Sequence, residues 1–324
     1  MEKRNLAVGV DLGGSHVSAG VLDTDGTVLT RKEIDINLEE DVERIIRGSI
    51  IPVIKDAMEE NPYLTDSIVA VGMGVPGSHD SSRGICHFSP NFNWREVSVT
   101  EPIQEALGIP VFMLNDVRSM ALGEKHFGAG QGVENFVVCA IGTGIGGGVV
   151  SQGRLILGPH EVAGEIGHIT VDPNGYKCNC GNYGCVEALA SGPNIARRAK
   201  EEMLNNKEST LWKYTSDPAE MSAHLLFKAA KHKDPTALKI WEQTGRYLGI
   251  CFASIVHTVN PSRFILGGRV ANAMEFFLPA LNDELSKRAR MIPPGAVEIV
   301  PAGLRDNVGI IGSAALAFEK MGIL

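Results

Sequence analysis

Short apolar runs alternate with amphipathic segments along most of the chain. The runs "LAVGVD", "IVAVGMGV" and "IPVFMLND" have the length of buried strands, and each ends in glycine or polar residues. Residues 39–60 and 117–130 have apolar positions at helical spacing. We expect Pro52 to kink or divide the first helix and glycine to stop the second. Alternating strands and helices predict an α/β fold, in which ligands collect beyond the carboxyl ends of the strands.

A weak internal repeat follows from the same pattern. "NLAVGVDLGGSHVSAGVLDTDGTVLT" and "NFVVCAIGTGIGGGVVSQGRLILG" both read as strand, glycine turn, strand, short turn, strand. Asp25-Gly26 and Gln152-Gly153 form the short turns. The repeat predicts two related α/β halves that face each other. We expect mostly helices after the cysteine cluster to about residue 260, a strand at "FILGG", and a small-residue C-terminal helix that packs tightly against a sheet.

Composition narrows the class of protein. The length of 324 residues predicts two domains, and a hydrophobic content of 44% is ample for their cores. The 30 basic and 38 acidic residues give a net charge of -8. Without a basic block, nucleic acid is not expected as the main partner. No apolar stretch approaches the roughly 18 residues of a membrane span, and the first residues do not resemble a signal peptide. We therefore expect a cytoplasmic protein, where clustered cysteines bind metal more often than they form disulfides.

The glycine turns favour phosphate binding. Residues 142–147, "GTGIGG", match G-x-G-x-x-G, but the dinucleotide fingerprint requires a following helix, and strands are predicted there instead. A dehydrogenase is therefore not expected, and neither a Walker A nor a protein-kinase catalytic motif occurs. Asp11 and Ser15 around Gly13-Gly14 suit a Mg²⁺–phosphate group. One such loop could be an ordinary hairpin, but two repeat-related loops and Gly267-Gly268 favour a nucleotide clamp.

Asn115 and Asp116 follow an apolar strand and begin a helix. A carboxylate in this place can be an ordinary helix cap. It can equally accept a proton from a substrate hydroxyl, with Asn115 orienting the substrate. Local sequence does not separate these interpretations.

Three of the six cysteines lie within eight residues, at Cys178, Cys180 and Cys185, and His168 precedes them. Three thiolates and one imidazole are a common structural zinc set, and four protein ligands leave no open position for catalysis. Redox chemistry would favour C-x-x-C, which is absent here. Cys139 and Cys251 lie in apolar segments and are expected to be buried.

Glu165 and Glu187 flank this cluster in sequence. A rigid metal loop could direct both carboxylates and the second imidazole nitrogen at one small polyhydroxy ligand. The alternative is that both are ordinary surface glutamates.

These motifs together resemble the ROK family of bacterial sugar kinases, in the hexokinase–actin-like superfamily, over essentially the whole chain. The segments that carry the resemblance are "VGVDLGGSHVSAGVLD", "GMGVPGSHDSSRGICHFSPNFNW", "LNDVRSMALGE", "IGTGIGGGVV", "EVAGEIGHITVDPNGYKCNCGNYGCVEALASG" and "FILGGRVA". The combination of E-x-x-G-H with C-x-C-G-x-x-G-C-x-E is highly specific. Many members have Thr-Lys where this chain has Ser15-His16.

The resemblance implies two related RNase H-like (actin/hexokinase-like) α/β domains flanking a cleft, with residues 1–117 and 308–324 in the smaller one and 118–307, including the zinc-binding loop, in the larger. It implies ATP-dependent phosphorylation of a hexose hydroxyl, usually the 6-hydroxyl, with Mg²⁺ accompanying ATP. Asp116 would be the general base. The implied sugar ligands are Asn91, Asn115, Asp116, Glu165, His168 and Glu187. The implied nucleotide and phosphate-site residues are Asp11, Gly13, Gly14, Ser15, Thr143, Gly144, Gly267 and Gly268. The implied structural zinc ligands are His168, Cys178, Cys180 and Cys185.

Two other functions fit parts of the pattern. The same family contains sugar-responsive repressors, which carry an N-terminal helix-turn-helix domain, and we expect no room for one before the first glycine loop. A zinc-stapled sugar-binding protein without catalysis is the second alternative. The resemblance suggests a homodimer or homotetramer, and the hexose itself is not specified by these motifs.

Overall fold

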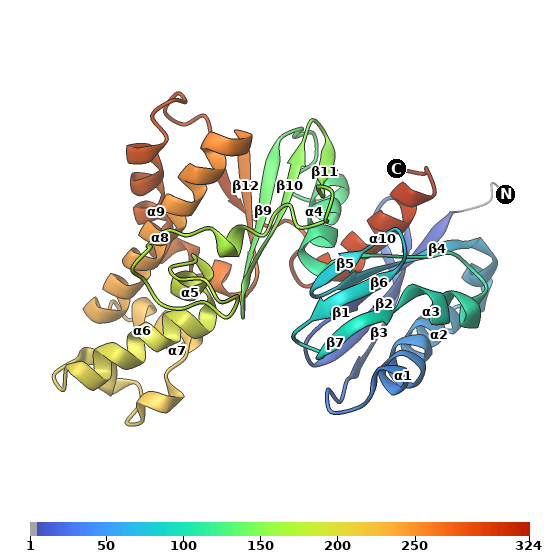
Figure 1. Ribbon diagram of the computed structural model, residues 1–324, viewed down its shortest axis with the longest axis horizontal. Coiled ribbons are helices and arrows are strands. Elements are labelled where there is room, and N and C mark those ends of the chain that lie inside the picture. Colours follow the sequence, from blue (N-terminus) through green and yellow to red (C-terminus); the bar gives the residue numbers. More distant parts are fainter. Residues whose placement is uncertain (1–4) are drawn as a thin grey trace. The chain divides into compact units, whose positions relative to one another are not determined.

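The computed structural model describes residues 5–324 (Figure 1). Contacts divide the chain into two compact units: the first comprises residues up to Val138, Gly148–Gly164 and Ala302–Leu324, and the second Cys139–Gly147 and Glu165–Pro301. The domain boundary expected after residue 117 stays a prediction. Within the described residues, no helix combines the length and hydrophobicity that a bilayer crossing requires.

The first sheet places three strand ends together. Its strand order is β3 (Val28–Asp35), β2 (His16–Asp23), β1 (Leu6–Leu12), β4 (Ile68–Val75) and β8 (Val111–Asn115). The first three strands pair antiparallel, whereas β1, β4 and β8 are parallel. The carboxyl ends of β1, β4 and β8 therefore meet at one edge of the sheet.

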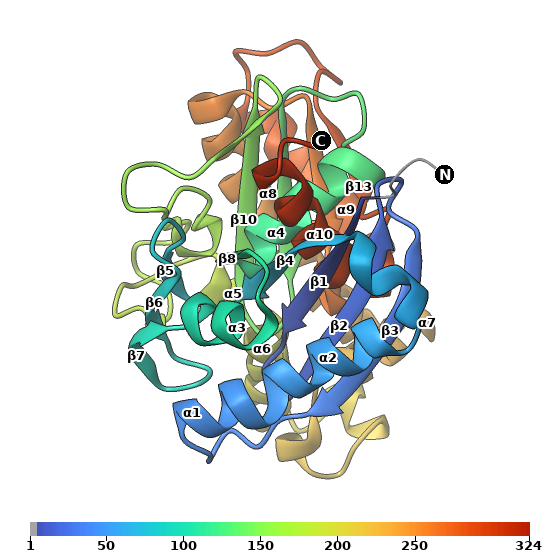
Figure 2. The ribbon, with the colours of Figure 1, turned by 90° about the vertical axis from the view of Figure 1, so that its right-hand side faces the viewer.

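Successive side chains along β1 point alternately into two hydrophobic layers, one on each face of the sheet. Leu6, Val8, Val10 and Leu12 belong to the core under α1 (Val42–Ile45), α2 (Ile51–Glu59) and α3 (Thr100–Leu107). Figure 2 shows α1 and α2 lying across this sheet. A π-helical segment, Ile46–Ile50, separates α1 from α2 directly before Pro52, so the predicted division of this helix is confirmed. The intervening positions of β1, from Ala7 on, face α10 (Val308–Lys320).

Glycines allow α10 to lie directly on the strands. A Cβ added at Gly9 would overlap the carbonyl of Ile310, and one at Gly72 would overlap the carbonyl of Ser313. Gly9 and Gly72 are paired in register across β1 and β4. The prediction of a small-residue helix packed tightly on a sheet is confirmed. On its other side, α10 contacts α4 (Asp116–Phe127).

A small antiparallel sheet follows β4, and the sequence pattern did not predict it. Its order is β5 (Ser78–Asp80), β6 (Ile85–Ser89) and β7 (Trp94–Ser98). These strands are too short for alternation to be recognised. The rings of Trp94 and Phe92 pack with centroids 4.8 Å apart and planes tilted by 34°, and both residues belong to the core.

The second five-stranded sheet repeats the order of the first. Its strands are β11 (Arg154–Ile156), β10 (Ile145–Ser151), β9 (Phe136–Ile141), β12 (Arg263–Gly267) and β13 (Glu298–Pro301). In the first sheet, β3 and β2 lie on one side of β1, and β4 and β8 lie on the other. In the second sheet, β11 and β10 lie on one side of β9, and β12 and β13 lie on the other. The predicted repeat is therefore confirmed, and strands rather than a helix follow the second glycine loop.

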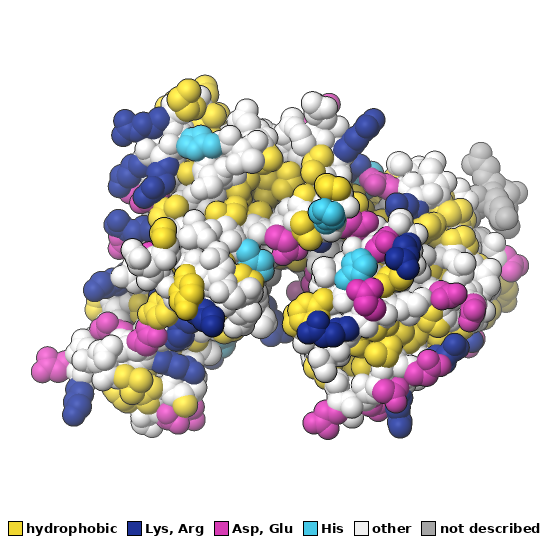
Figure 3. All heavy atoms as spheres, viewed as in Figure 1, with side chains coloured by type: hydrophobic (Ala, Val, Ile, Leu, Met, Phe, Trp, Pro, Cys, Tyr) yellow, Lys and Arg dark blue, Asp and Glu magenta, His cyan; other side chains and the backbone are white. Residues whose placement is uncertain are grey.

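Helices dominate the remainder of the second unit. The longer ones are α6 (Gly192–Asn205), α7 (Ala223–Lys231), α8 (Pro235–Val259) and α9 (Met274–Arg288), and the four-residue α5 (Glu187–Ala190) precedes them. Short 3₁₀ segments cover Pro62–Ser67, Ile166–His168, Thr210–Lys213, Pro218–Glu220, Arg269–Ala273 and Arg305–Asn307. Cys139 and Cys251 are buried, as predicted. Acidic and basic side chains are interspersed on the face shown in Figure 3.

Candidate active site and metal centre

Asp116 lies at the carboxyl edge of the first sheet. Asn115, at the end of β8, is the N-cap of α4: its side-chain oxygen accepts from the N–H groups of Val117 (3.1 Å) and Arg118 (3.3 Å). Its amide also donates to the Gly77 carbonyl at 3.3 Å. The interpretation of Asp116 as the helix cap is therefore wrong, because Asn115 has that role and Asp116 is the first helical residue.

Asp11 lies at the same edge of the sheet, near the end of β1. It is paired in register with Gly74 of β4, whose successor Val75 is paired with Asn115. Burial and then the negative charge of Asp116 raise the pKa of Asp11 to about 6. Two carboxylates that repel each other at one sheet edge form an attractive site for a cation.

A glycine makes room for the Asp11 carboxylate. A Cβ at Gly309, in the first turn of α10, would overlap that carboxylate. The side chain of Asp11 therefore packs directly on the start of a helix, where the helix dipole favours negative charge.

The first glycine loop connects β1 to β2. The Gly13 N–H donates to the His16 carbonyl at 2.9 Å, which closes the turn, and Gly14 and Ser15 are exposed. Ser15 Oγ lies 3.2 Å from His16 Nδ1. A Cβ at Gly14 would be 3.9 Å from the side-chain nitrogen of Asn91, so the exposed Asn91 borders this loop. Asn91 thus borders the first glycine loop, while Asp11, Asn115 and Asp116 lie at the carboxyl edge of the sheet.

The second glycine loop is held by a glutamate that is distant in sequence. Gly142 N–H donates to the Gly144 carbonyl at 2.9 Å, and Thr143 is exposed at the tip. Oε2 of Glu187 accepts from the Ile145 N–H at 2.8 Å. The interpretation of Glu187 as an ordinary surface glutamate is therefore wrong. Sequence reasoning did not find this bond, because no local pattern connects residues 145 and 187.

Gly267 and Gly268 lie beside the second glycine loop. Gly267 ends β12, which neighbours β9 in the sheet, and Gly268 directly follows that strand. Gly268 has a φ of 80°, and a Cβ there would overlap the Ile141 carbonyl. The glycine permits the close approach of two strand ends, as expected for backbone that lines a phosphate or nucleoside site.

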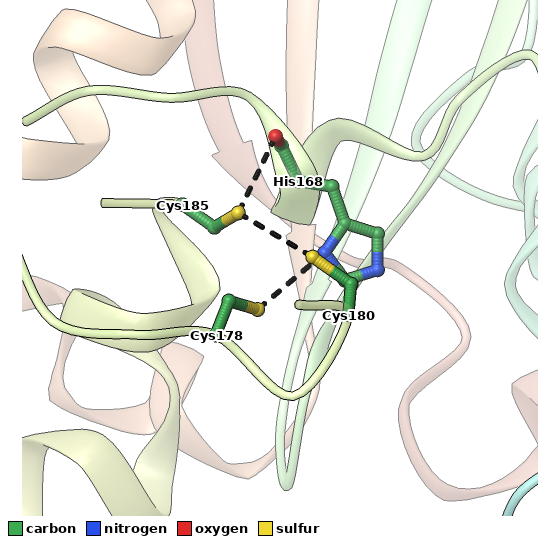
Figure 4. A group of neighbouring side chains, drawn as sticks. All are labelled: His168, Cys178, Cys180 and Cys185. Atoms are coloured by element: carbon green, nitrogen blue, oxygen red, sulfur yellow. Dashed lines mark hydrogen bonds between the residues drawn. The ribbon is translucent and has the colours of Figure 1, made fainter. Parts of the chain in front are cut away.

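His168, Cys178, Cys180 and Cys185 converge in the second unit (Figure 4). One ligand atom from each residue lies within 4.8 Å of all the others. His168 Nδ1 is 3.7 Å from the Cys178 sulfur, and the sulfurs of Cys180 and Cys185 are also 3.7 Å apart. All three cysteines are free thiols, so this is not a disulfide staple.

The donor set fits a tetrahedral ion. Burial raises the pKa of the Cys178 thiol to about 12, so this thiol is neutral at physiological pH unless a cation stabilises its thiolate. On the opposite side of the ring, His168 Nε2 lies 4.0 Å from the Glu165 carboxylate. The imidazole therefore faces the cysteines with one nitrogen and the partly exposed Glu165 with the other. A carboxylate in this place helps to orient a histidine that binds a metal.

Known proteins share this whole architecture. Glucokinase from Thermotoga maritima is 38% identical over 97% of this chain and 98% of its own. The crystal structure of a ROK family glucokinase from Streptomyces griseus in complex with glucose and AMPPNP superimposes with a TM-score of 0.81 at 31% identity, covering 96% of this chain and 99% of that one. The xylose repressor of Bacillus subtilis is 30% identical over 98% of this chain and 78% of its own.

These similarities agree with a match to one family model. The model described as "ROK family" matches residues 7–320. The fold is accordingly the mixed α/β, actin/hexokinase-like fold of its structural neighbours. This chain belongs to the ROK family.

Proposed function

We propose that this chain is an ATP-dependent hexose kinase that phosphorylates the 6-hydroxyl of glucose or a related hexose. The observation that carries the proposal is the carboxylate of Asp116 at the carboxyl edge of the first sheet, relieved of helix capping by Asn115. Similarity to glucokinases from Thermotoga maritima and Streptomyces griseus supports the same activity.

Phosphoryl transfer depends mainly on positioning and charge neutralisation. Asp116 would accept the proton of the sugar hydroxyl as that oxygen attacks the terminal phosphorus of ATP, with ADP as the leaving group. Mg²⁺ bound with ATP would supply charge neutralisation on the phosphates. Asp11 would face that cation, whose charge would favour the ionised form that burial and Asp116 disfavour.

Backbone N–H groups of the two glycine loops would contact phosphate oxygens. The first loop offers Gly13, Gly14 and Ser15, and the second offers Thr143 and Gly144, with Gly267 and Gly268 on the nucleoside side. Exposure of Gly14, Ser15 and Thr143 supports this role.

Five further side chains would form hydrogen bonds with the sugar. These are Asn91, Asn115, Glu165, His168 and Glu187. In support, the imidazole of His168 and the carboxylate of Glu165 lie together and are partly exposed.

The Cys₃His cluster would hold a structural zinc ion. His168, Cys178, Cys180 and Cys185 would fill four positions and leave none for substrate. The ion would keep the loop of residues 168–185 in one conformation and so fix the outward nitrogen of His168. We also expect a cytoplasmic homodimer or homotetramer with sugar and ATP, and not nucleic acid, as partners; light scattering would test the assembly.

The proposal is tested with purified protein, Mg²⁺–ATP and a panel of hexoses that includes glucose, fructose, mannose, allose and N-acetylated hexosamines. We expect ADP release that depends on one or a few of these sugars, with phosphate on the sugar. Absence of sugar-dependent ADP release from every hexose would overturn the proposal.

Similarity to a xylose repressor favours one alternative, a sugar-responsive regulator. A regulator would bind its sugar in calorimetry without forming ADP. Substitution of Asp116 would then have no catalytic consequence to measure.

A further inference from the structure

Glu187 lies between the second glycine loop and the cysteine cluster. Its Oε2 accepts the Ile145 N–H at 2.8 Å, while its Oε1 is 3.8 Å from the Cys178 sulfur. A Cβ at Gly144 would be 2.6 Å from the same Oε2, so only glycine leaves room for this carboxylate. One side chain thus contacts both the loop backbone and the metal cluster.

The short helix that carries Glu187 is held from several sides. The side chain of Asn194 donates to the Glu187 carbonyl at 2.8 Å, and Arg197 donates to the Ala188 carbonyl at 2.6 Å. On the side of the cluster, the Val186 N–H donates to the Ile169 carbonyl at 2.9 Å. Ile169 directly follows the ligand His168, and Val186 follows the ligand Cys185, so both partners of this bond are attached to the cluster.

The glycine loop has few restraints of its own. Residues 142–147 contain four glycines, which gain backbone freedom wherever no contact restrains them. Ile145–Gly147 begin β10, whereas Gly142–Gly144 lie outside it. In that turn the Gly142 N–H donates to the Gly144 carbonyl at 2.9 Å, and the Gly192 N–H donates to the Gly142 carbonyl at 2.8 Å. A hydrogen bond from an N–H to an ionised carboxylate is among the stronger restraints available.

We propose that Glu187 is a positioning residue for the second glycine loop, and that the metal cluster supports nucleotide binding through it. The proposal rests on the proposed function, because it assigns this loop to the phosphates of ATP. It adds a second role for the ion bound by His168 and the three cysteines. That ion would order the second glycine loop, which binds nucleotide, as well as the residues that bind sugar. A Glu187 that served only as a sugar ligand would need no bond to Ile145.

The test measures nucleotide binding without sugar. Calorimetry with a nonhydrolysable ATP analogue and Mg²⁺ compares the wild type with Glu187→Ala, Glu187→Gln and the control Glu208→Gln, which makes the same charge change at an exposed position of the same unit. We expect Glu187→Ala to weaken analogue binding about tenfold, Glu187→Gln to weaken it less because its amide oxygen can still accept from Ile145, and the control to bind as the wild type does.

Metal removal completes the test. Chelated wild type should lose a similar factor in analogue affinity, whereas chelated Glu187→Ala should lose little more than Glu187→Ala itself. Amide exchange of residues 142–147, measured by mass spectrometry, should be faster in chelated wild type and in Glu187→Ala than in metal-loaded wild type. This second readout does not depend on activity and separates loop loosening from global unfolding, which would accelerate exchange everywhere.

Two results would overturn the inference. The first is analogue affinity and loop exchange in Glu187→Ala that match the wild type while sugar affinity falls. The second is chelated wild type with unchanged analogue affinity. A wild type that binds no nucleotide at all would instead overturn the proposed function together with the inference.

Discussion

The two glycine loops occupy equivalent places in their sheets, but the carboxylates beside them differ in what stabilises their charge. Each follows the central strand of its sheet, β1 or β9. Each is accompanied by a carboxylate that packs against a glycine: Asp11 against Gly309 and Glu187 against Gly144. Asp11 is near the charge of Asp116, and burial and that charge raise its pKa to about 6. Glu187 accepts a backbone N–H at 2.8 Å.

The difference concerns what satisfies each charge. A buried carboxylate beside another carboxylate is destabilised until a cation arrives, so Asp11 suits chemistry with a metal–phosphate group. A carboxylate that accepts an N–H is already stabilised, so Glu187 suits the restraint of backbone. Internal repetition has therefore conserved the loop geometry of the two halves while their electrostatics differ.

The largest expected effect comes from substitution of Asp116, the carboxylate whose charge raises the pKa of Asp11. Asp116→Asn should lower kcat by about 10²–10⁴-fold, because the sugar hydroxyl loses its general base. Sugar affinity measured by calorimetry should stay within a few-fold of the wild type. Turnover near the wild-type rate would refute the assignment of the base.

Asp11→Asn should separate stability from activity. Because the folded-state pKa is raised from 3.8 to about 6, ionised Asp11 destabilises the fold at pH 7, and this penalty disappears as pH falls from about 6 to 4. We expect the variant without nucleotide to gain about 3 kcal/mol in the free energy of unfolding at pH 7. The same variant should lose kinase activity. Urea titrations at pH 7 and pH 4 provide the measurement.

An unchanged free energy of unfolding at pH 7 would show that Asp11 carries no electrostatic strain. The comparison with Glu187→Gln is then informative. That variant removes a carboxylate that accepts a backbone N–H, so it should show no gain in the free energy of unfolding at pH 7.

Cys180→Ala tests the metal centre of the second unit. Loss of one ligand should release the ion and weaken sugar affinity about 10–100-fold, because His168 and its neighbours lose their frame. Metal content by atomic absorption and sugar affinity by calorimetry check both parts. If chelated wild type bound sugar as tightly as the metal-loaded protein, the coupling would be wrong.

His79 contributes an opposite pH effect of similar size in the first unit. It is 3% exposed, neither ring nitrogen has a hydrogen-bond partner among the described residues, and burial, with the nearby Arg118 charge, lowers its pKa from 6.5 to about 4. The unfolded state therefore binds the proton first, and stability falls by about 1 kcal/mol per pH unit as pH drops from 6.5 towards 4.

His79→Leu should flatten that acid limb in urea titrations and so isolate the opposite contribution of Asp11. A limb with the same slope in the variant would assign the acid sensitivity to other groups. The matched control is His160→Leu, which removes an exposed imidazole.

Much of the architecture is readable from local pattern. Strand length, glycine punctuation and the turns at Asp25-Gly26 and Gln152-Gly153 predict both hairpin repeats, and the structure contains them. The spacing of the small residues in the C-terminal segment predicts a tightly packed helix, and α10 is that helix. The sheet of β5, β6 and β7 escaped prediction, because three to five residues carry too little periodicity.

Residue chemistry likewise indicated the participants of the site. Three cysteines and a histidine at close spacing predict a metal centre, and their ligand atoms do converge. Local sequence left Asp116 between cap and base, however, and left Glu187 between ligand and surface residue. Both questions depend on which partner a polar group finds, and that partner is distant in sequence or in a neighbouring turn.

Sequence alone thus carries the order of elements, the repeat and the membership of the metal cluster, because these depend on neighbours within a few residues. Tertiary structure decides how each charge is satisfied. Asn115 takes the cap from Asp116 through helix geometry, the charge of Asp116 raises the pKa of Asp11 across a sheet edge, and Glu187 reaches Ile145 over 42 positions. Electrostatic and hydrogen-bond energies depend on distance in space, which the linear pattern does not contain.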